Sequence, residues 1–263
     1  MELIIDINGI CPLKCEFCYQ DLDGSVLSED EIYRIVDNSS SRTVGIGGGE
    51  PFTDKRVVNI IKNIREKGRR VHVSTSGIAI PKGLFDLSDK LRDETQIQVS
   101  LHASNPELYK RVTGKDRFNQ VIRNIPQFNE YFRTLISSVV YKENLDDLPN
   151  IIDISKNIGV PIRVELAFPV QGKDFEMVSR DEVDRLVGYL LGEKLLSRGF
   201  DNGYSIESPL IHIKNNCSAL ANAYGIDKSG LCPADCGKCY VSPRGEIKPC
   251  EFLPSLEEAL KWN

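Results

Sequence analysis

Short apolar runs alternate with longer amphipathic segments along residues 3–199. The short runs are rich in Val and Ile and predict strands, whereas the longer segments repeat apolar residues at helical spacing and predict helices. The expected strands are 3–7, 43–47, 70–75, 95–103, 133–141 and 161–168. The expected helices are 28–39, 54–68, 84–92, 105–112, 117–128, 145–159 and 179–199. This order indicates an α/β fold with a parallel sheet, and six β/α units favour a partial, TIM-like (β/α)6 barrel.

Local signals mark the ends of two of these helices. Ser28 with Glu31 three residues later has the pattern of a capping box, in which each residue satisfies a backbone N–H of the other. Gly68 stands where a glycine commonly ends a helix. These signals support helices that begin near residue 28 and end near residue 68.

The alternation stops after residue 199. Segment 240–250 predicts a hairpin with Arg244 and Gly245 in its turn, and 255–262 predicts a short helix. Five of the eight cysteines also lie beyond residue 200. We therefore divide the chain into a barrel domain, 1–199, and a small cysteine-rich extension, 200–263.

Polar or glycine-rich phrases follow every predicted strand of the barrel. In chain order they are NGICPLKC, GGGEPF, STSG, SLHAS, YKEN and FPVQG. The carboxyl ends of parallel strands meet at one edge of a sheet, and sites of α/β proteins lie there. We therefore expect the chemistry of this protein at that edge.

Composition limits the class of protein. Apolar residues make up 41% and charged residues 27% of the 263, as in ordinary globular domains. The net charge of −5 argues against a general nucleic-acid binder. No apolar run approaches the roughly 20 residues that cross a bilayer, and the start has no signal-peptide pattern. We expect a cytoplasmic protein with no membrane and no nucleic-acid partner.

The cysteines are clustered, which is unusual for buried structural thiols. Cys11, Cys15 and Cys18 lie close together, and no further cysteine follows until Cys217. The cytosol keeps thiols reduced, so clustered cysteines there more often bind metal or react. Three thiolates without a nearby histidine suit an iron–sulfur cluster or a zinc site that lacks one ligand. Zinc with a remote fourth ligand and inert thiols remain the alternatives.

The phrases CPLKCEFC (11–18) and GGGEP (47–51) together resemble the signature of the radical S-adenosylmethionine (SAM) superfamily. The resemblance covers the barrel region in order and spacing. It implies that Cys11, Cys15 and Cys18 hold a [4Fe–4S] cluster with one open iron site. That iron would chelate the amino and carboxylate groups of SAM, and Phe17 would pack on the adenine.

The resemblance also implies cofactor contacts at later strand ends. Gly48 and Gly49 would let the backbone approach SAM closely, and Glu50 or backbone oxygens beside it would meet the SAM ammonium. Further expected contacts lie at or just after the ends of the third, fourth and fifth strands, at Ser74, Ser100 and Asn144. Weaker candidates are Arg163, Glu165 and His102, each of which is equally explained as an ordinary polar residue near a strand end.

The second cysteine group resembles the SPASM and twitch extensions of the same superfamily, which carry auxiliary iron–sulfur clusters. The phrase CPADCGKCYVSPRGEIKPC predicts one auxiliary [4Fe–4S] cluster, with four ligands among five cysteines. The favoured ligands are Cys232, Cys236, Cys239 and Cys250, with Cys217 as a spare or alternative ligand. A four-cysteine zinc site fits this spacing nearly as well.

The expected function is that of a radical SAM enzyme, an oxidoreductase or a peptide- or cofactor-maturation enzyme. It would cleave SAM reductively to a 5′-deoxyadenosyl radical and abstract hydrogen from a peptide or small-molecule substrate, with the auxiliary cluster assisting oxidation or substrate binding. Implied partners are an electron donor such as flavodoxin or ferredoxin and, for a peptide substrate, a separate delivery protein. The alternatives are a non-catalytic iron–sulfur electron-transfer protein and a radical SAM enzyme with a structural zinc at its C-terminus.

Overall fold

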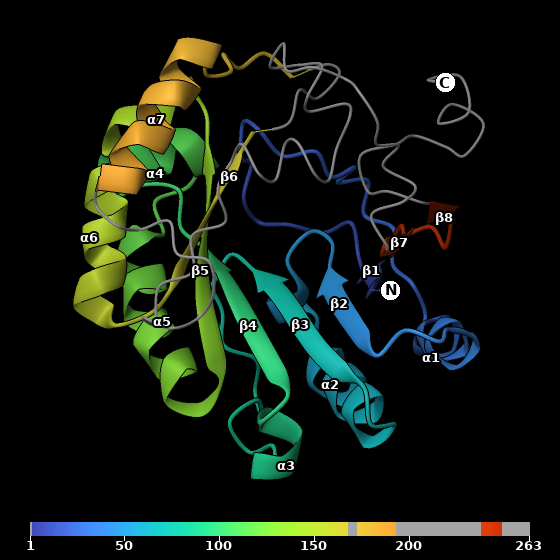
Figure 1. Ribbon diagram of the computed structural model, residues 1–263. Coiled ribbons are helices and arrows are strands. Elements are labelled where there is room, and N and C mark those ends of the chain that lie inside the picture. Colours follow the sequence, from blue (N-terminus) through green and yellow to red (C-terminus); the bar gives the residue numbers. More distant parts are fainter. Residues whose placement is uncertain (1, 168–172, 193–237, 249–263) are drawn as a thin grey trace.

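A single eight-stranded sheet runs through the computed structural model, which describes residues 2–167, 173–192 and 238–248 (Figure 1). The strand order is β6-β5-β4-β3-β2-β1-β7-β8, and every neighbouring pair except β7–β8 is parallel. The strands are β1 (Glu2–Asp6), β2 (Thr43–Gly47), β3 (Arg70–Thr75), β4 (Thr95–Ser100), β5 (Arg133–Val140), β6 (Ile162–Leu166), β7 (Lys238–Val241) and β8 (Ile247–Lys248). The predicted α/β class and the six β/α units are confirmed.

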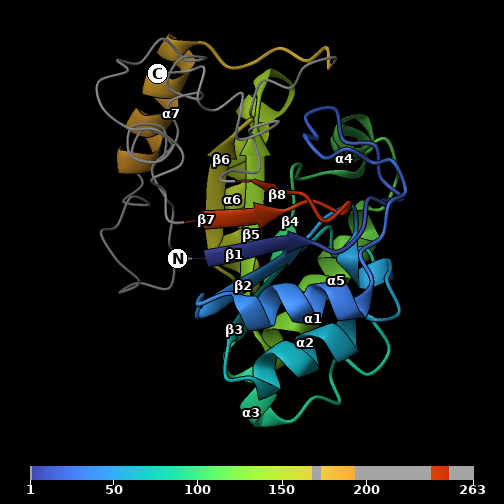
Figure 2. The same ribbon diagram turned by 90° about the vertical axis from the view of Figure 1, so that its right-hand side faces the viewer.

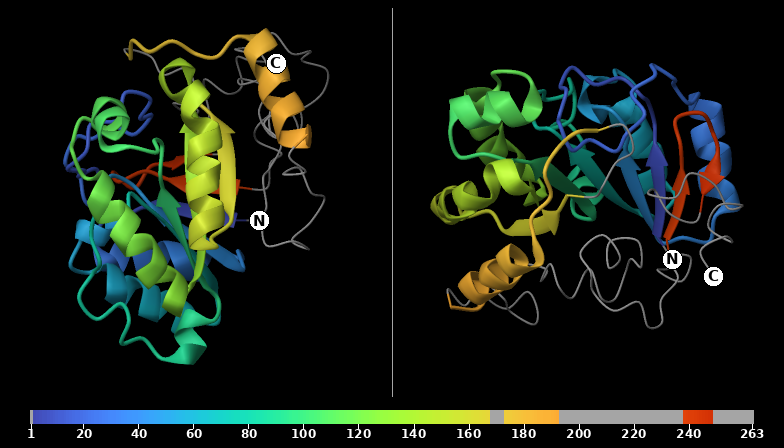
Figure 3. Two further views of the ribbon diagram at one scale, coloured as in Figure 1. Left: turned by 90° about the vertical axis from the view of Figure 1, so that its left-hand side faces the viewer. Right: turned by 90° about the horizontal axis from the view of Figure 1, so that it is seen from above.

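The helices lie on the outer face of a curved sheet, which is seen from above in the right-hand view of Figure 3. They are α1 (Glu29–Asn38), α2 (Val57–Glu66), α3 (Asp89–Arg92), α4 (Pro106–Thr113), α5 (Phe118–Tyr131), α6 (Leu148–Ile158) and α7 (Arg180–Gly192), with 3-10 helices η1 (Pro51–Thr53) and η2 (Lys142–Asp147). The sheet is therefore an open, partial barrel.

The core lies between the sheet and these helices. On β1, Leu3 and Ile5 are almost fully buried, and on α1 the buried side chains are Ile32 and Val36. Each such aliphatic side chain contributes about 1.5–3 kcal/mol when it leaves water. Successive strand residues point to opposite faces, so the residues between these apolar positions face the inside of the barrel.

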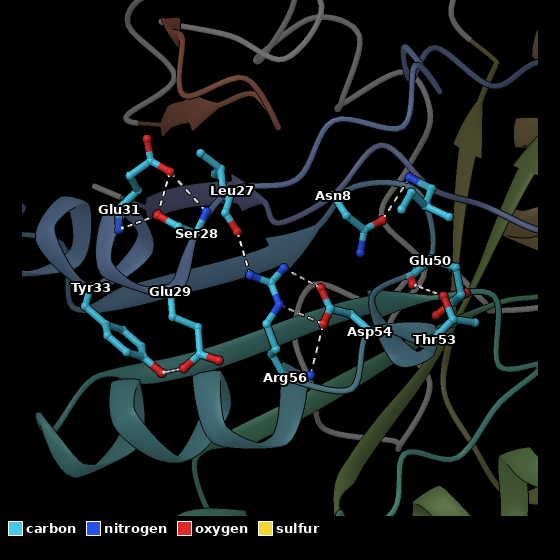
Figure 4. A network of polar contacts seen from close by, with 11 residues as sticks. Asn8, Leu27, Ser28, Glu29, Glu31, Tyr33, Glu50, Thr53, Asp54 and Arg56 are labelled. Atoms are coloured by element: carbon cyan, nitrogen blue, oxygen red, sulfur yellow. Dashed lines mark hydrogen bonds and ion pairs between the residues drawn. The ribbon is translucent and has the colours of Figure 1, made fainter.

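The predicted capping box at the start of α1 is confirmed (Figure 4). The Glu31 backbone N–H donates to Ser28 Oγ at 3.2 Å, and the Ser28 backbone N–H donates to Glu31 Oε2 at 3.0 Å. A cap of this kind contributes about 1 kcal/mol to helix stability. It fixes the point at which the chain leaves the long loop after β1.

The expected helix at 84–92 is shorter in the structure, where α3 spans only Asp89–Arg92. Ser88 has an extended backbone, and the helix begins directly after it. Leu84 and Leu87 are buried in the turns that precede it. The apolar spacing that predicted a longer helix therefore reflects burial in successive turns.

The predicted hairpin is confirmed as β7–β8, with Gly245 at a positive φ of 80° in its turn. It is also part of the barrel sheet, because β7 lies beside β1 (Figure 2). The two strands pair in parallel, with Tyr240 opposite Ile4. This pairing satisfies the edge of β1, which the sequence pattern left unassigned. The expected domain boundary and the helix at 255–262 fall outside the described residues.

An ion-pair cluster joins the same hairpin to the loop that follows Cys18. Arg244 Nε donates to Asp23 Oδ2 at 2.6 Å, and Arg244 Nη2 donates to Asp21 Oδ2 at 3.0 Å. The Asp23 carboxylate also accepts from the Ser25 backbone N–H at 2.9 Å. Residues near the two ends of the sequence therefore lie against each other.

Candidate active site

A cavity of about 330 Å³ opens inside the barrel, near the carboxyl ends of the strands. It brings together Cys11, Cys15 and Cys18 with Phe17. Its other lining residues include Glu2, Asp6, Gly47, Gly48, Gly49, His72, Ser74, Thr75, Ser76, Gln98, Ser100, His102, Ser137, Arg163 and Glu165. The expected edge of the sheet thus forms the wall of one cavity.

The three thiols are free and only partly exposed. Burial raises the pKa of Cys11 to about 11 and that of Cys15 to about 12, and the neighbouring thiols add to both shifts. Burial also raises the pKa of Cys18. Thiolates at these positions need a compensating cation, which an iron cluster provides.

The described side chains form no ready-made site for a single metal ion. Among residues 2–167, 173–192 and 238–248, no group of three or more His, Cys, Asp or Glu side chains is arranged to hold one metal ion. A four-iron cluster spreads its cysteine ligands around a larger body than one zinc ion does. Three cysteine ligands would leave one iron of such a cluster without a protein thiolate.

The glycine-rich phrase lies directly against the backbone of the loop that carries these cysteines. The Gly49 N–H donates to the Asn8 carbonyl at 2.7 Å, and the Glu50 N–H donates to the Ile10 carbonyl at 2.8 Å. A Cβ at Gly48 would lie 2.3 Å from the Asn8 oxygen, and one at Gly49 would lie 2.3 Å from the Ile10 oxygen. The glycines thus permit close contact with the cysteine loop, in addition to lining the cavity.

A polar network holds the start of this loop from below (Figure 4). Asn8 Oδ1 accepts from the Ile10 N–H at 3.0 Å. Nearby, Arg56 Nε donates to Asp54 Oδ1 at 3.0 Å, and Arg56 Nη1 donates to the Leu27 carbonyl at 2.7 Å. The Asn8 side chain also bonds the Asp54 carboxylate, so the network joins the residues before Cys11 to the segment that follows β2.

Glu50 is fully buried and does not line the cavity. Its carboxylate accepts from the Phe52 N–H at 2.9 Å, the Thr75 hydroxyl at 2.6 Å, the Ser76 N–H at 2.6 Å and the Ser76 hydroxyl. Burial raises the pKa of Glu50, and these four hydrogen bonds oppose that effect. Its side chain therefore anchors β2 to β3, and the backbone of the phrase is what faces the cavity.

The other expected cofactor contacts divide into two groups. Phe17, Ser74 and Ser100 line the cavity with Gly48 and Gly49. Asn144, expected at the ribose, instead lies behind the cavity wall and is fully buried. Its Nδ2 donates to the His102 carbonyl at 2.9 Å and its Oδ1 accepts from the Tyr141 N–H at 2.9 Å, so it joins the ends of β4 and β5.

Sequence reasoning missed residues that line the cavity from within the strands. Asp6 is 2% exposed, and its Oδ2 accepts from the Tyr240 hydroxyl at 2.5 Å. Glu2 lies 3.2 Å from His72. Gln98 accepts from Arg163 Nη1 at 3.2 Å. The sequence pattern that could have revealed them is the two-residue alternation along each strand, which places polar side chains on the inner face of the sheet.

Lys173 was also missed. It follows the residues between β6 and α7 that lie outside the description, and its side chain is exposed. Its positive charge lowers the pKa values of Cys15 and Cys18, against the larger effect of burial. A cation therefore lies near the thiols on the open side of the site.

Of the five C-terminal cysteines, only Cys239 belongs to the described residues. Cys217, Cys232, Cys236 and Cys250 lie outside them. Cys239 is opposite Leu3 on β1, and both line a groove beside α1 that also contains Ile35. The next residue, Tyr240, bonds Asp6 at the cavity. The Cys239 thiol therefore faces away from the cysteine triplet.

The comparisons with known proteins agree with this geometry. A model of the Radical SAM superfamily matches residues 5–154. A probable GTP 3′,8-cyclase of Saccharolobus islandicus (strain Y.N.15.51 / Yellowstone #2) is 25% identical over 265 residues, covering 95% of this chain and 82% of that protein. A probable GTP 3′,8-cyclase of Methanocaldococcus jannaschii is 30% identical over 182 residues, covering 65% of this chain and 60% of that protein.

Solved structures share the fold at low sequence identity. Streptococcus suis SuiB bound to precursor peptide SuiA superposes with a TM-score of 0.75 at 19% identity, covering 97% of this chain and 60% of SuiB. Native anSMEcpe with bound AdoMet has a TM-score of 0.67 at 17% identity, covering 96% of this chain and 75% of that protein.

No helix within the described ranges is long and apolar enough to cross a membrane.

The family match is decisive because it contains the residues that build the site. It spans more than half of the chain and includes both the cysteine triplet and GGGEP. The triplet and the glycine-rich phrase lie against each other at one cavity. The chain therefore belongs to the radical SAM superfamily, whose members use a [4Fe–4S] cluster and SAM.

Proposed function

We propose that the chain is an enzyme that holds a [4Fe–4S] cluster through Cys11, Cys15 and Cys18, binds SAM at its open iron and removes hydrogen from a substrate carbon. The observation that carries this proposal is the convergence of three thiols and the Gly48–Gly49 backbone on one cavity. In this superfamily the bound cluster and SAM supply a 5′-deoxyadenosyl radical by one-electron cleavage of a C–S bond.

The residues of the chain position and shield the reactants. The cysteines fix the cluster on a loop whose backbone is held by Gly49 and Glu50. The buried barrel walls keep water from a reactive group, which limits side reactions. The electron would come from a donor such as flavodoxin or ferredoxin.

The test of this function is formation of 5′-deoxyadenosine by the anaerobically reconstituted protein with dithionite and SAM, measured by mass spectrometry. The enzyme hypothesis expects this product. An iron-loaded protein that binds no SAM and releases no 5′-deoxyadenosine would instead support the electron-transfer alternative.

We further propose that the substrate is a peptide or small molecule without a polyphosphate group. The described cavity lining carries the carboxylates of Glu2, Asp6 and Glu165. Its one guanidinium, Arg163, lies 3.9 Å from Glu165, and His72 is paired with Glu2. This acidic balance favours neutral or cationic groups over a triphosphate.

GTP cyclisation is the second candidate, favoured by the 25% identity to the Saccharolobus protein over 95% of the chain. We expect that adding GTP and Mg²⁺ does not increase 5′-deoxyadenosine formation, because the described lining offers few cations to a triphosphate. The Saccharolobus protein assayed in parallel serves as a positive control. If GTP increased 5′-deoxyadenosine formation and a cyclised GTP product appeared, GTP cyclisation would become the favoured function.

We also propose an auxiliary cluster or zinc ion bound by the C-terminal cysteines. The Cys239 thiol faces away from the cysteine triplet, into the groove beside α1. We therefore favour Cys217, Cys232, Cys236 and Cys250 as the ligands of this auxiliary cluster or zinc ion. The Cys239→Ala variant is expected to keep the metal content of the wild type, because its thiol packs beside Leu3. The Cys236→Ala variant is expected to lose about four irons per chain, or one zinc.

Metal analysis of the two reconstituted variants checks this assignment. Both substitutions remove one thiol, so they are matched in the chemical group that is lost. If Cys239→Ala lost as much metal as Cys236→Ala, Cys239 would be a metal ligand and the assignment would be wrong.

A further inference from the structure

The turn that carries Cys15 and Cys18 is held by contacts from outside its own loop. The loop spans residues 7–28 between β1 and α1 and contains no helix or strand element of its own. Inside it, the Cys18 N–H donates to the Cys15 carbonyl at 3.2 Å, which closes a turn. The Glu16 N–H donates to the Val112 carbonyl of α4 at 3.2 Å, which ties the same turn to a helix. A loop without regular structure depends on such outside contacts for a fixed shape.

Tyr141, the residue that follows β5, reaches the same turn with its side chain. Its hydroxyl donates to Glu16 Oε2 at 2.7 Å, across 125 positions of the sequence. Its ring also contacts the Phe17 ring, with 5.4 Å between the centroids and 60° between the planes. Glu16 and Phe17 are the two residues between Cys15 and Cys18. One side chain therefore holds both residues that separate two of the three thiols.

Tyr141 is itself fixed from several directions. It is 1% exposed, and its N–H donates to Asn144 Oδ1 at 2.9 Å. On its ring, Phe175 packs edge to face, with 5.6 Å between the centroids and 87° between the planes. Tyr141 does not line the cavity, so it supports the turn from behind the cavity wall. A buried side chain that is packed in this way has little freedom to move, and it restrains the residues that it contacts.

The hydrogen bond to Glu16 joins a buried group to an exposed one. Glu16 is the partner of the Tyr141 hydroxyl among the described residues. A buried hydroxyl needs an acceptor, and a carboxylate is a stronger acceptor than a neutral oxygen. The Glu16 side chain lies at the exposed end of the bond. The tie can therefore be broken at that end without removing any buried packing.

We propose that Tyr141 is a positioning residue that fixes the Cys15–Cys18 turn through its hydrogen bond to Glu16 and its contact with Phe17. By this contact it holds two thiols and the Phe17 ring in the arrangement that SAM binding requires. Tyr141 acts through the turn and touches neither cluster nor SAM. This inference rests on the proposed SAM-binding function.

The tie can be broken from either end. Tyr141→Phe removes the hydroxyl and keeps the ring, and Glu16→Ala removes the acceptor at an exposed position where folding is not at risk. We expect each variant to bind SAM about fivefold more weakly, because the turn is then free to sample other shapes. The double variant is expected to bind no more weakly than either single one, since both changes remove the same bond. Glu16→Gln keeps an acceptor oxygen and is expected to lose less than about twofold.

A second tyrosine–glutamate pair provides the matched control. The Tyr33 hydroxyl donates to Glu29 Oε2 at 2.8 Å on α1, and neither residue lines the cavity (Figure 4). Tyr33→Phe and Glu29→Ala remove the same chemical groups as the test variants and are expected to bind SAM as the wild type does. Isothermal titration of SAM into the oxidised, iron-loaded proteins measures the affinities without turnover, and iron content gives the loaded fraction to which each affinity is referred.

The outcomes separate this inference from the proposed function. Wild-type SAM affinity in iron-loaded Tyr141→Phe and Glu16→Ala proteins would overturn the positioning role and leave the proposed function intact. An equal loss of affinity in the Tyr33→Phe and Glu29→Ala proteins would also overturn it, because a general loss of stability would then explain both pairs. A wild type that binds no SAM at all would instead contradict the proposed function.

Discussion

Replacing Cys11, Cys15 and Cys18 together with Ala is expected to abolish 5′-deoxyadenosine formation, lowering the rate by at least about a thousandfold. Among the described residues, these three thiols are the cysteines that line the cavity. Without them SAM loses its point of attachment and its source of an electron. Mass spectrometry of the product measures the loss.

Low-temperature EPR of the same proteins separates loss of the cluster from loss of the fold. The reduced wild type is expected to show a [4Fe–4S] signal that shifts when SAM is added, and the triple variant is expected to lack it. Cys239→Ala is the control, because the Cys239 thiol lies on the face of β7 that points away from the cavity. An EPR signal that still shifts with SAM in the triple variant would contradict the assignment of these three cysteines as cluster ligands.

Glu50→Ala is expected to reduce the free energy of unfolding by about 3 to 5 kcal/mol. The substitution leaves the donors of Phe52, Thr75 and Ser76 without the buried carboxylate that accepts from them. It also frees the glycine-rich backbone beside the cavity, so SAM affinity should fall with stability. Urea denaturation and calorimetric titration of SAM measure the two effects.

Glu31→Ala is the matched control for this prediction. Glu31 also accepts hydrogen bonds from a backbone N–H and a hydroxyl, those of Ser28, but it is exposed on α1. Its loss should cost about 1 kcal/mol and leave SAM affinity unchanged. If Glu50→Ala destabilised the protein no more than Glu31→Ala, the anchoring role of Glu50 would be wrong.

The fold follows largely from local patterns, with one long-range exception. Apolar periodicity and turn residues placed the strands and helices of residues 3–192 close to where they lie. They did not place β7 beside β1, because four residues with the sequence KCYV carry no information about which strand edge they pair with. Edge pairing depends on the unpaired backbone groups of the sheet rather than on the strand itself.

The site was predictable where chemistry and strand ends coincide. The cysteine triplet and Phe17 follow β1, Ser100 ends β4, and all of them line the cavity as expected. The roles of Glu50 and Asn144 depend on hydrogen bonds to residues far along the chain. Their burial behind the cavity wall could therefore not be predicted from the sequence. Glu2 and Asp6 were missed because they lie within a strand rather than after it.

The pairing of β7 with β1 has a consequence for synthesis of the chain on the ribosome. β1 and the cysteine loop emerge early, whereas Tyr240, which bonds Asp6, is separated from it by 234 positions. Until residues 238–248 have been made, one edge of β1 has no partner strand, and Arg244 cannot close the loop after Cys18. A nascent chain of six strands therefore exposes a sheet edge that needs protection from other chains, and its metal-binding loop is closed only when translation reaches the hairpin.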